Sequence, residues 1–281
     1  MKSIRILLFI SVFIIPSAVL AGGGWTQAKR SGYFKLGQNF IIANQFYQPD
    51  GEIVDITTVS LYTTSAYLEY GFTDRLTGTL YFPFFVRSTL NEVEYTSGRP
   101  SDPGDVVNSI GDTDIGLKYG LLQNGPVVLA VGLTLGLPLG ETTGGETGLL
   151  QTGDGEFNQL FTVEASRAFG SFYATALVGF NNRTEDFSDE FRYGLEIGRS
   201  WNDRWITQLR FYGVESFMNG DTEGGGGNSI FANNLEFLAI TPEVAYNIRD
   251  NFGVTVNAGF AAFGRRVLAN PNYGVGLFYT F

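Results

Sequence analysis

Two acidic residues stand two apart in Asp112-Thr113-Asp114, and Lys118 follows four residues later. Two carboxylates that face the same way could carry out general acid–base chemistry. Buried opposite charges are normally paired, however, so the same residues could neutralise one another inside a closed fold. The chain has no histidine and no cysteine, which removes Ser-His and Cys-His catalysis and metal sites with such ligands. We therefore expect Asp112 and Asp114 to meet Lys118 or neighbouring arginines rather than to catalyse a reaction.

The segments that carry these charges alternate between apolar residues and polar or small ones. Within 111–122, Ile115, Leu117, Tyr119 and Leu121 fall on one side, and charged residues or glycines fall between them. This period of two is that of a β-strand with two different faces. The stretch 127–140, VVLAVGLTLGLPLG, repeats the pattern with an aliphatic residue at every odd position. It is long enough to cross a bilayer when tilted, which takes roughly 9–11 residues.

The same pattern recurs along the whole chain. We predict strands at 33–47, 57–72, 76–87, 111–122, 127–140, 158–168, 172–181, 191–201, 205–215, 235–248, 252–263 and 272–281. Tight turns and long loops alternate between them, as in bacterial outer-membrane barrels. The sequence therefore predicts an all-β fold, a single transmembrane antiparallel β-barrel of about 12 strands over residues 33–281. Short turns would face the periplasm and long loops the exterior.

Composition supports this fold. The chain has 37 Gly, 25 Phe and 14 Tyr, with only 16% charged residues, which favours twisted sheet over helix. No Lys or Arg falls mid-strand on a proposed outer face, where it would cost roughly 2–4 kcal/mol. The segment 235–248 fits least well, because its alternation shifts around Thr241-Pro242, and we predict a β-bulge there.

The first 21 residues have the features of a secretory signal peptide. Lys2 and Arg5 precede an apolar run over 6–16, and Val19-Leu20-Ala21 is a small-residue cleavage site. Removing this segment takes the net charge from −10 to −12, so an exported, acidic chain is not expected to bind nucleic acid. Residues 22–32 then form a short periplasmic lead, which we expect to be flexible and too short to act as a plug.

Ten charged residues fall on the inward faces of the predicted strands. They could line an open lumen, or they could pair and fill it, and the alternation leaves both readings open. These lumen-lining candidates are Lys35, Glu69, Asp112, Asp114, Lys118, Glu164, Arg192, Glu196, Arg210 and Glu243.

Three prolines lie within predicted strands, at Pro83, Pro138 and Pro242. Proline cannot donate to a strand ladder, so each should sit at a bulge or a strand end. One hypothesis is that such a weak point opens the barrel wall and lets an apolar molecule pass sideways into the membrane. The alternative is a local kink that only shapes the wall.

Two groups of residues carry a resemblance to known proteins. The chain ends in Gly-Leu-Phe-Tyr-Thr-Phe, and Gly276, Tyr279 and Phe281 resemble the signal that the bacterial barrel-assembly machinery recognises. The motifs at 110–119 (IGDTDIGLKY), 136–140 (GLPLG), 152–155 (TGDG) and 241–243 (TPE) resemble the outer-membrane family linked to the meta-pathway of phenol degradation. That family usually has Leu-Pro-Thr-Gly where this chain has Leu137-Pro138-Leu139-Gly140. The resemblance implies a transporter of aromatic or other apolar compounds.

We therefore expect an outer-membrane channel for passive uptake of small apolar or aromatic solutes, with no cofactor or metal. The alternative is a structural or binding barrel with a closed lumen and interacting extracellular loops. Outer-membrane phospholipases, lipid A-modifying enzymes and omptin-type proteases use a histidine, so an enzyme is not expected. The partners implied are outer-membrane lipid, lipopolysaccharide, the barrel-assembly machinery and a small solute.

Overall fold

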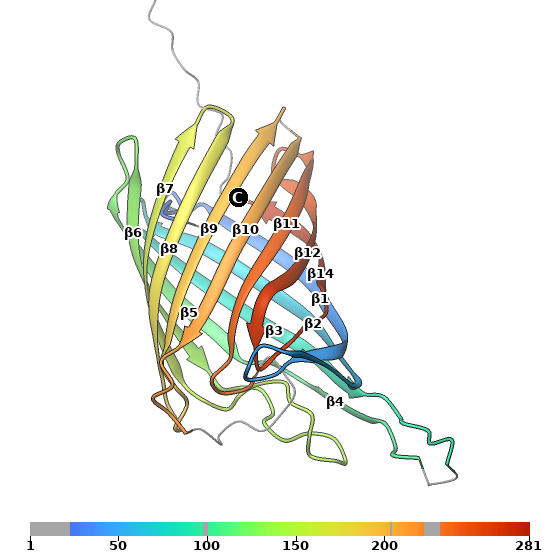
Figure 1. Cartoon of the computed structure of the whole chain (residues 1–281). Coiled ribbons are helices and arrows are strands. Elements are labelled where there is room, and N and C mark those ends of the chain that lie inside the picture. The colour runs from blue at the N-terminus through green and yellow to red at the C-terminus, as the bar shows by residue number, and fades with distance from the viewer. Residues whose placement is uncertain (1–22, 98–100, 203, 222–230) are drawn as a thin grey trace, which may run out of the picture.

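The computed structural model describes residues 23–97, 101–202, 204–221 and 231–281, which form one antiparallel sheet closed into a barrel (Figure 1). No helix in these ranges is long and apolar enough to cross a membrane. Twelve strands make the wall: β1 (Gly32–Tyr47), β2 (Ile53–Thr73), β3 (Leu76–Leu90), β5 (Thr113–Leu122), β6 (Val128–Leu137), β7 (Asn158–Phe169), β8 (Phe172–Arg183), β9 (Glu190–Trp201), β10 (Trp205–Ser216), β11 (Glu236–Arg249), β12 (Phe252–Arg265) and β14 (Asn272–Thr280).

The first and last wall strands close the barrel. β1 pairs with β14 from Tyr33↔Thr280 to Ile41↔Asn272, while its other edge pairs with β2. Because every wall strand has two antiparallel neighbours, the sheet has no free edge to leave backbone groups unpaired. The predicted twelve-stranded antiparallel barrel is confirmed.

The two ends of the barrel differ. Tight turns at 74–75, 123–127, 170–171, 202–204 and 250–251 lie at one end, which we call the turn end. The other six connections lie at the opposite end, the loop end, and all but the first are longer than any at the turn end: 48–52, 91–112, 138–157, 184–189, 217–235 and 266–271, of which 98–100 and 222–230 are outside the described residues. The chain terminus also lies at the turn end, where the Gly32 N–H donates to the Phe281 carbonyl oxygen at 2.8 Å (Figure 1).

Two short strands were not expected from the sequence. β4 (Asp105–Ser109) lies in a predicted loop, yet it pairs with the end of β3 from Val86↔Ser109 to Leu90↔Asp105. β3 runs on past the start of β5 and needs a partner there, and Val107 of β4 is buried in the contact. β13 (Val267–Leu268) similarly pairs with the end of β1.

The three prolines occupy different positions. Pro138 follows the end of β6, which stops at Leu137 rather than continuing to Gly140 because proline has no N–H to donate. Pro83 lies inside β3 and Pro242 inside β11. The bulge predicted at Thr241-Pro242 is misplaced.

The β11–β12 ladder has two register shifts: opposite Leu238 and Ala239, where β12 carries one extra residue, and between Asn247 and Arg249, where β11 carries one. At Pro242 the β11–β12 ladder instead skips two residues without changing register, from Ile240↔Phe260 to Glu243↔Asn257. The missing proline N–H accounts for the skipped pairs. The unbroken β10–β11 register, from Trp205↔Tyr246 to Val214↔Phe237, shows that β11 keeps its alternation through Pro242.

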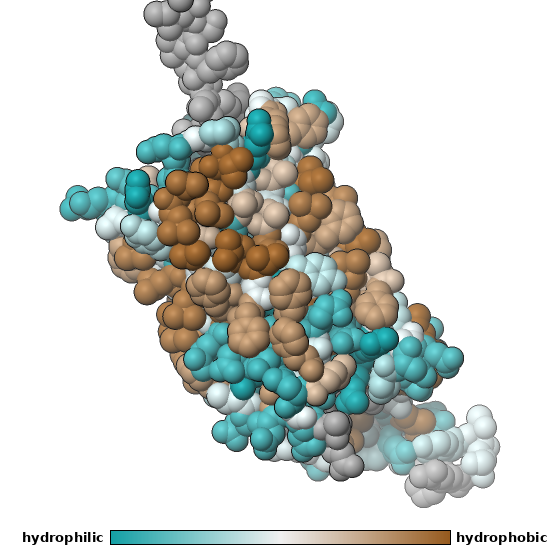
Figure 2. Space-filling model, turned by 60° about the vertical axis from the view of Figure 1, so that its left-hand side comes forward, coloured by the Kyte–Doolittle hydropathy of each residue, from teal (hydrophilic) through white to brown (hydrophobic). Residues whose placement is uncertain are grey.

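The outer wall is apolar, as the alternation predicts. Along β5, Ile115, Leu117 and Tyr119 are each about half exposed, at 48%, 53% and 46%, while Lys118 between them is buried. Figure 2 shows apolar side chains gathered on the wall, with hydrophilic residues concentrated towards the loop end. A monomer in water would rarely expose such a broad apolar surface. The distribution is the one expected of a wall that faces lipid.

A charge placed on this wall tests that assignment. Leu117→Lys at the centre of β5 should lower the free energy of unfolding by about 2–4 kcal/mol, and Leu122→Lys beside a turn by about 0–1 kcal/mol. The measurement is guanidinium-induced unfolding of the barrel in lipid vesicles. Equal losses for the two variants would contradict a lipid-facing wall.

Candidate functional site: the barrel lumen

The predicted inward-facing charges do face the interior, where they separate into three layers. Glu69, Lys118 and Glu164 lie towards the turn end. Lys35, Glu196, Arg210 and Glu243 line the middle. Asp112, Asp114 and Arg192 lie towards the loop end. Asp154 and Glu190, which the sequence analysis did not place in the lumen, lie near them.

The turn-end layer contains a segment that precedes the barrel. Residues 23–31, here the N-terminal segment, cross the inside of the opening. The Gly24 N–H donates to Ser166 Oγ of β7 at 2.8 Å, and the Gln27 N–H donates to Thr77 Oγ1 of β3 at 2.8 Å. The Arg30 N–H then donates to the Gly71 carbonyl oxygen of β2 at 2.7 Å. The segment thus spans from one side of the barrel mouth to another.

Side chains of the wall hold this segment in place. Gln123 receives a hydrogen bond from the Thr26 N–H at 3.2 Å and donates to the Gly24 carbonyl oxygen at 2.9 Å. Lys118 Nζ donates to the Gly23 carbonyl oxygen at 2.9 Å. The sequence analysis expects a flexible lead, whereas residues 23–31 are hydrogen-bonded to the wall at several positions. The segment has turns at 23–24 and 29–30, and its contacts with β7, β3 and β2 carry it along the inside of the opening.

Glu69 is buried beneath the N-terminal segment, with a relative exposure of 1%. Its two carboxylate oxygens accept hydrogen bonds from Tyr67 Oη at 2.6 Å and Gln27 Nε2 at 2.8 Å. A buried carboxylate left without donors is strongly destabilising, so Gln27 ties the segment to β2.

A cavity of about 750 Å³ occupies the middle of the lumen. This volume lies within the range of pockets that bind small molecules, about 300–1,000 Å³. Its lining reaches the turn end at Ser200, Asn247 and Asp250, on the side of the mouth that the N-terminal segment leaves uncovered. Aromatic side chains contribute to the lining at Tyr33, Tyr67, Tyr81, Tyr212 and Phe278.

Two close ion pairs lie in the cavity wall. Lys35 Nζ lies 3.3 Å from Glu243 Oε2, and Arg210 Nε donates to Glu196 Oε2 at 2.8 Å. Tyr173 Oη also donates to Glu196, at 2.7 Å. These pairs brace the wall, while Glu164 and Asp250 add two further carboxylates to the lining. The sequence left open whether the inward-facing charges line an open lumen or pair and fill it. In the structure several of them form ion pairs, and a cavity remains between them.

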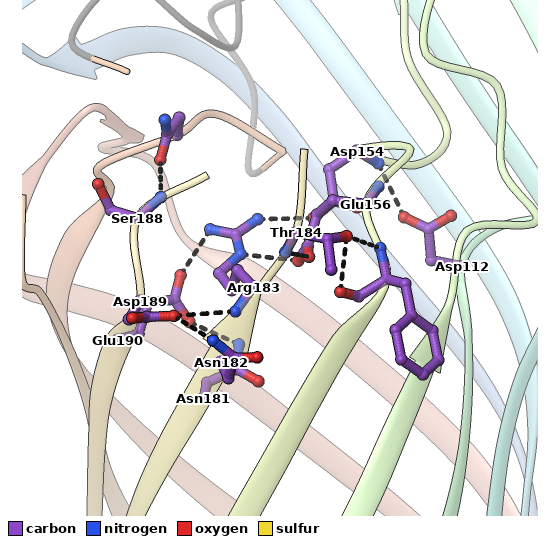
Figure 3. A network of polar contacts seen from close by, with 12 residues as sticks. Asp112, Asp154, Glu156, Asn181, Asn182, Arg183, Thr184, Ser188, Asp189 and Glu190 are labelled. Atoms are coloured by element: carbon purple, nitrogen blue, oxygen red, sulfur yellow. Dashed lines mark hydrogen bonds and ion pairs between the residues drawn. The ribbon is translucent and has the colours of Figure 1, made fainter. Parts of the chain in front are cut away.

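Arg183, at the end of β8, organises the loop-end layer (Figure 3). Its guanidinium group makes ion pairs with Asp154 at 2.9 Å, Glu156 at 2.7 Å and Glu190 at 2.8 Å. The side chains of Arg183, Glu156 and Glu190 are 4%, 0% and 3% exposed. Arg192 adds a second cation, 2.7 Å from Glu190. This Arg183 cluster holds the loop 138–157 against β8 and β9.

Asp112 belongs to the same layer and has a structural role. Its carboxylate oxygens accept the Gly140 N–H at 2.9 Å and the Asp154 N–H at 2.8 Å. Gly153 lies so close that a Cβ there would meet Asp112 Oδ1 at 2.2 Å. The carboxylate is thus occupied by backbone donors, which is the arrangement of a loop anchor and not of a general base.

The sequence analysis missed the Arg183 cluster. It left Asp154 and Glu156 in the connection between the strands predicted at 127–140 and 158–168, and it ended the next strand at Asn181. One signal was present: Arg183 shares the alternation of inward-facing Tyr173 and Asn181. No group of three or more metal-ligating residues is arranged to hold a metal ion in the described part of the chain.

Burial raises the pKa of Asp154 to about 6, against the opposing effect of Arg183 and with a further contribution from the nearby Asp112. A carboxyl whose pKa is higher in the folded state than in the unfolded state stabilises the fold at low pH. That contribution is lost as the pH rises through about 6. Protonation of Asp154 as the pH falls towards 5 therefore stabilises the packed loop.

The closed ladder, the apolar wall and the polar lumen define a β-barrel of the outer-membrane type. No protein-family model and no curated protein sequence matches the chain.

Several solved outer-membrane barrels are similar to it in structure. An outer-membrane channel from Pseudomonas putida has a TM-score of 0.63 at 12% identity, with 92% of this chain and 98% of that chain covered. The KdgM porin has a TM-score of 0.50 at 8% identity, with 89% and 99% covered. The Ralstonia pickettii toluene transporter TbuX has a TM-score of 0.45 at 11% identity, with 92% and 91% covered. Identities this low establish a shared fold alone.

Displacing the N-terminal segment should widen the lumen. A methyl group at Gly71 would lie 2.1 Å from the Ala28 carbonyl oxygen, so Gly71→Ala must push the backbone of the segment away. We expect a higher single-channel conductance in planar bilayers. Gly37→Ala is the control, because its methyl group would be 3.6 Å from the nearest atom, Ser65 Oγ. Indistinguishable conductances would refute a role of the segment in narrowing the channel.

Removing the central cation should release the loop 138–157. Arg183→Met leaves Glu156 and Glu190 buried without their main partner, a change that costs about 3–5 kcal/mol for buried pairs. Hydrogen exchange in residues 140–157 should accelerate, and Arg87→Met at an exposed site should leave it unchanged. Unaltered exchange in the Arg183 variant would show that the cluster does not hold the loop.

Proposed function

We propose that the chain is an outer-membrane channel for passive entry of small apolar or aromatic compounds. The observation that carries this proposal is the cavity of about 750 Å³ whose lining includes four tyrosines and two phenylalanines, inside a barrel whose outer wall is apolar. Aromatic rings supply flat apolar contact area and, in tyrosine, a hydroxyl that can bind a polar substituent.

The proposal includes export and orientation. A signal peptide over residues 1–21 would direct the chain to the periplasm, and the Gly276, Tyr279 and Phe281 pattern would be read by the barrel-assembly machinery. The turn end would face the periplasm, and the loops would face outward beside lipopolysaccharide. Tyr279 and Phe281 are 42% and 48% exposed and their rings stack at 6.1 Å, so they are accessible on the outer wall.

The route into the cavity that we propose is lateral, because buried ion pairs pack the loop end. The N-terminal segment narrows the turn end without closing it. The candidate opening is the seam between β3 and β5. Their ladder runs only from Leu76↔Tyr119 to Tyr81↔Asp114. Beyond it, the Gly111 N–H donates to the Pro83 carbonyl oxygen at 2.8 Å.

The other side of Pro83 is irregular as well. Thr64 pairs with Phe85 and Ala66 pairs with Phe82, so Pro83 and Phe84 lie in a bulge of the β2–β3 ladder. Pro138 lies just beyond the Thr113↔Leu137 pair, on the opposite side of the start of β5. Two of the three prolines thus flank one short stretch of wall, whereas Pro242 lies elsewhere, in β11. This clustering favours the seam at Pro83 over the other two sites.

A reversible cross-link tests the lateral route. A Cβ at Gly111 would lie 3.2 Å from Cβ of Pro83, near the separation of about 3.5–4.5 Å that a disulfide requires. Because the chain has no other cysteine, Pro83→Cys combined with Gly111→Cys can form a single defined disulfide. Uptake of naphthalene by cells carrying this variant should fall under oxidising conditions and recover with dithiothreitol.

The matched control joins β3 to β4 through Arg87→Cys and Asn108→Cys, a paired position beyond the seam. Its oxidation should not affect uptake. Full uptake with the seam locked would exclude this route. If uptake is also the same in cells without the protein, the alternative function, a structural or binding barrel, would replace transport. The connection between β3 and β4 projects sideways from the loop end (Figure 1). This projection is the feature that favours the alternative function.

A further inference from the structure

Two arginines lie on the outer wall close to the turn end. Arg199 of β9 shares the alternation of Ile197, and Arg167 of β7 shares that of Phe161, and both of these apolar residues are exposed on the wall. Each strand reaches its turn, at 170–171 or at 202–204, within three residues of its arginine. The two side chains therefore stand where the apolar wall meets the turn end, and not at the middle of the wall.

Three aromatic rings pack against the two guanidinium groups. Arg199 Cζ lies 3.5 Å from the ring centroid of Trp201 and 4.7 Å from that of Phe172, and Arg167 Cζ lies 4.8 Å from that of Phe169. Phe172 of β8 is paired with Phe169 on one side and with Arg199 on the other. The five side chains thus form one continuous surface, which we call the arginine patch.

The arginine patch contains cations but no anion. In the described part of the chain neither arginine side chain forms an ion pair or a hydrogen bond, and Arg199 Nε is buried without an acceptor. The cations of the lumen differ, because Lys35, Arg183 and Arg210 each contact a carboxylate. Buried donors in proteins normally have an acceptor, so Arg199 lacks a group that should complete its surroundings.

The two ends of the barrel differ in charge. The loop 138–157 at the loop end has four acidic residues and no basic one. In the turns, the N-terminal segment and the outward-facing strand ends of the turn end, the described chain has the acidic residues Asp74 and Asp250 and seven basic ones: Lys29, Arg30, Arg75, Arg167, Arg199, Arg204 and Arg249. An anionic membrane surface is therefore attracted to the turn end.

We propose that the arginine patch binds the phosphate group of an anionic phospholipid. Arg199 and Arg167 would donate to the phosphate oxygens, and the three rings would contact the adjoining part of the acyl chains. Arginine suits this ligand because its guanidinium group is always charged, and its planar fork can donate to phosphate while one face stacks on an aromatic ring. The proposal rests on the orientation given above, in which the turn end lies in the periplasmic, phospholipid leaflet and lipopolysaccharide surrounds the loop end.

Tryptophan fluorescence can report on this patch directly. Trp201 stacks on Arg199, and Trp201 and Trp205 are 44% and 46% exposed on the wall near the turn end. The refolded protein is placed in vesicles of phosphatidylcholine that contain increasing amounts of brominated phosphatidylglycerol, and quenching gives the binding constant of phosphatidylglycerol relative to phosphatidylcholine. Both leaflets contain the probe and no solute is added. The result therefore depends neither on the orientation of the barrel nor on whether it transports aromatic compounds.

We expect the unsubstituted protein to prefer phosphatidylglycerol. Arg199→Gln should lower the relative binding constant about fivefold, the effect of one cation near an anionic membrane surface, and Arg167→Gln should lower it in the same direction. Arg75→Gln is the matched control, because it removes the same charge at the same end of the barrel but outside the patch. It should change the constant less than about twofold. Arg199→Lys keeps the charge but loses the stacked fork, and should give an intermediate value.

An equal loss in Arg75→Gln and Arg199→Gln would assign the preference to the total charge of the turn end and overturn the proposal. An unchanged constant in Arg199→Gln would also overturn it, since the arginine would then serve only to stack on its rings. If Arg199→Gln does not fold, Arg167→Gln and the unsubstituted protein decide. Equal binding of the two lipids by the unsubstituted protein contradicts the proposal without any variant.

Discussion

Closure of the hydrogen-bond ladder between β1 and β14 is the constraint on which the rest of the structure depends. A bilayer offers no water to satisfy backbone groups, so a sheet can enter it only without free edges. Closure in turn fixes the two faces of every strand, because alternate residues must point to lipid or to the lumen. The apolar outer wall and the crowding of charged residues inside the barrel are both consequences of this one pairing.

The enclosed charges explain how the lumen is organised. Buried charges are tolerated when they are paired and hydrogen-bonded, and the interior meets this requirement differently at each level. Arg183 forms ion pairs with three carboxylates at the loop end. Lys35 and Arg210 each form an ion pair with one carboxylate in the middle. At the turn end, the N-terminal segment donates hydrogen bonds from uncharged groups. The tyrosine-lined cavity is the space left between these braced layers. Its contents must therefore be compatible with aromatic and paired polar surfaces.

The strands could be predicted from the sequence because a period of two is a local property, visible for example in Ile115, Leu117 and Tyr119. The inward direction of Glu69 and Glu243 followed from the same alternation. The position of residues 23–31 could not be predicted, because a short glycine-rich segment has no periodicity and its partners, such as Gly71 and Ser166, are distant in sequence. β4 was missed for a related reason. It forms because β3 extends beyond the part that pairs with β5, and this extension is not visible in the sequence of β4 itself. The Arg183 cluster depends on where a loop folds back, which no local pattern encodes.

The most direct test of this account is the planar-bilayer conductance of the refolded, mature protein. Packing of the loop end by buried ion pairs and crossing of the turn end by the N-terminal segment both predict a small conductance, well below that of an open porin, and no wide axial path. A large and steady conductance would mean that the lumen is continuous from end to end. It would contradict both the proposed lateral route and the role assigned to the N-terminal segment.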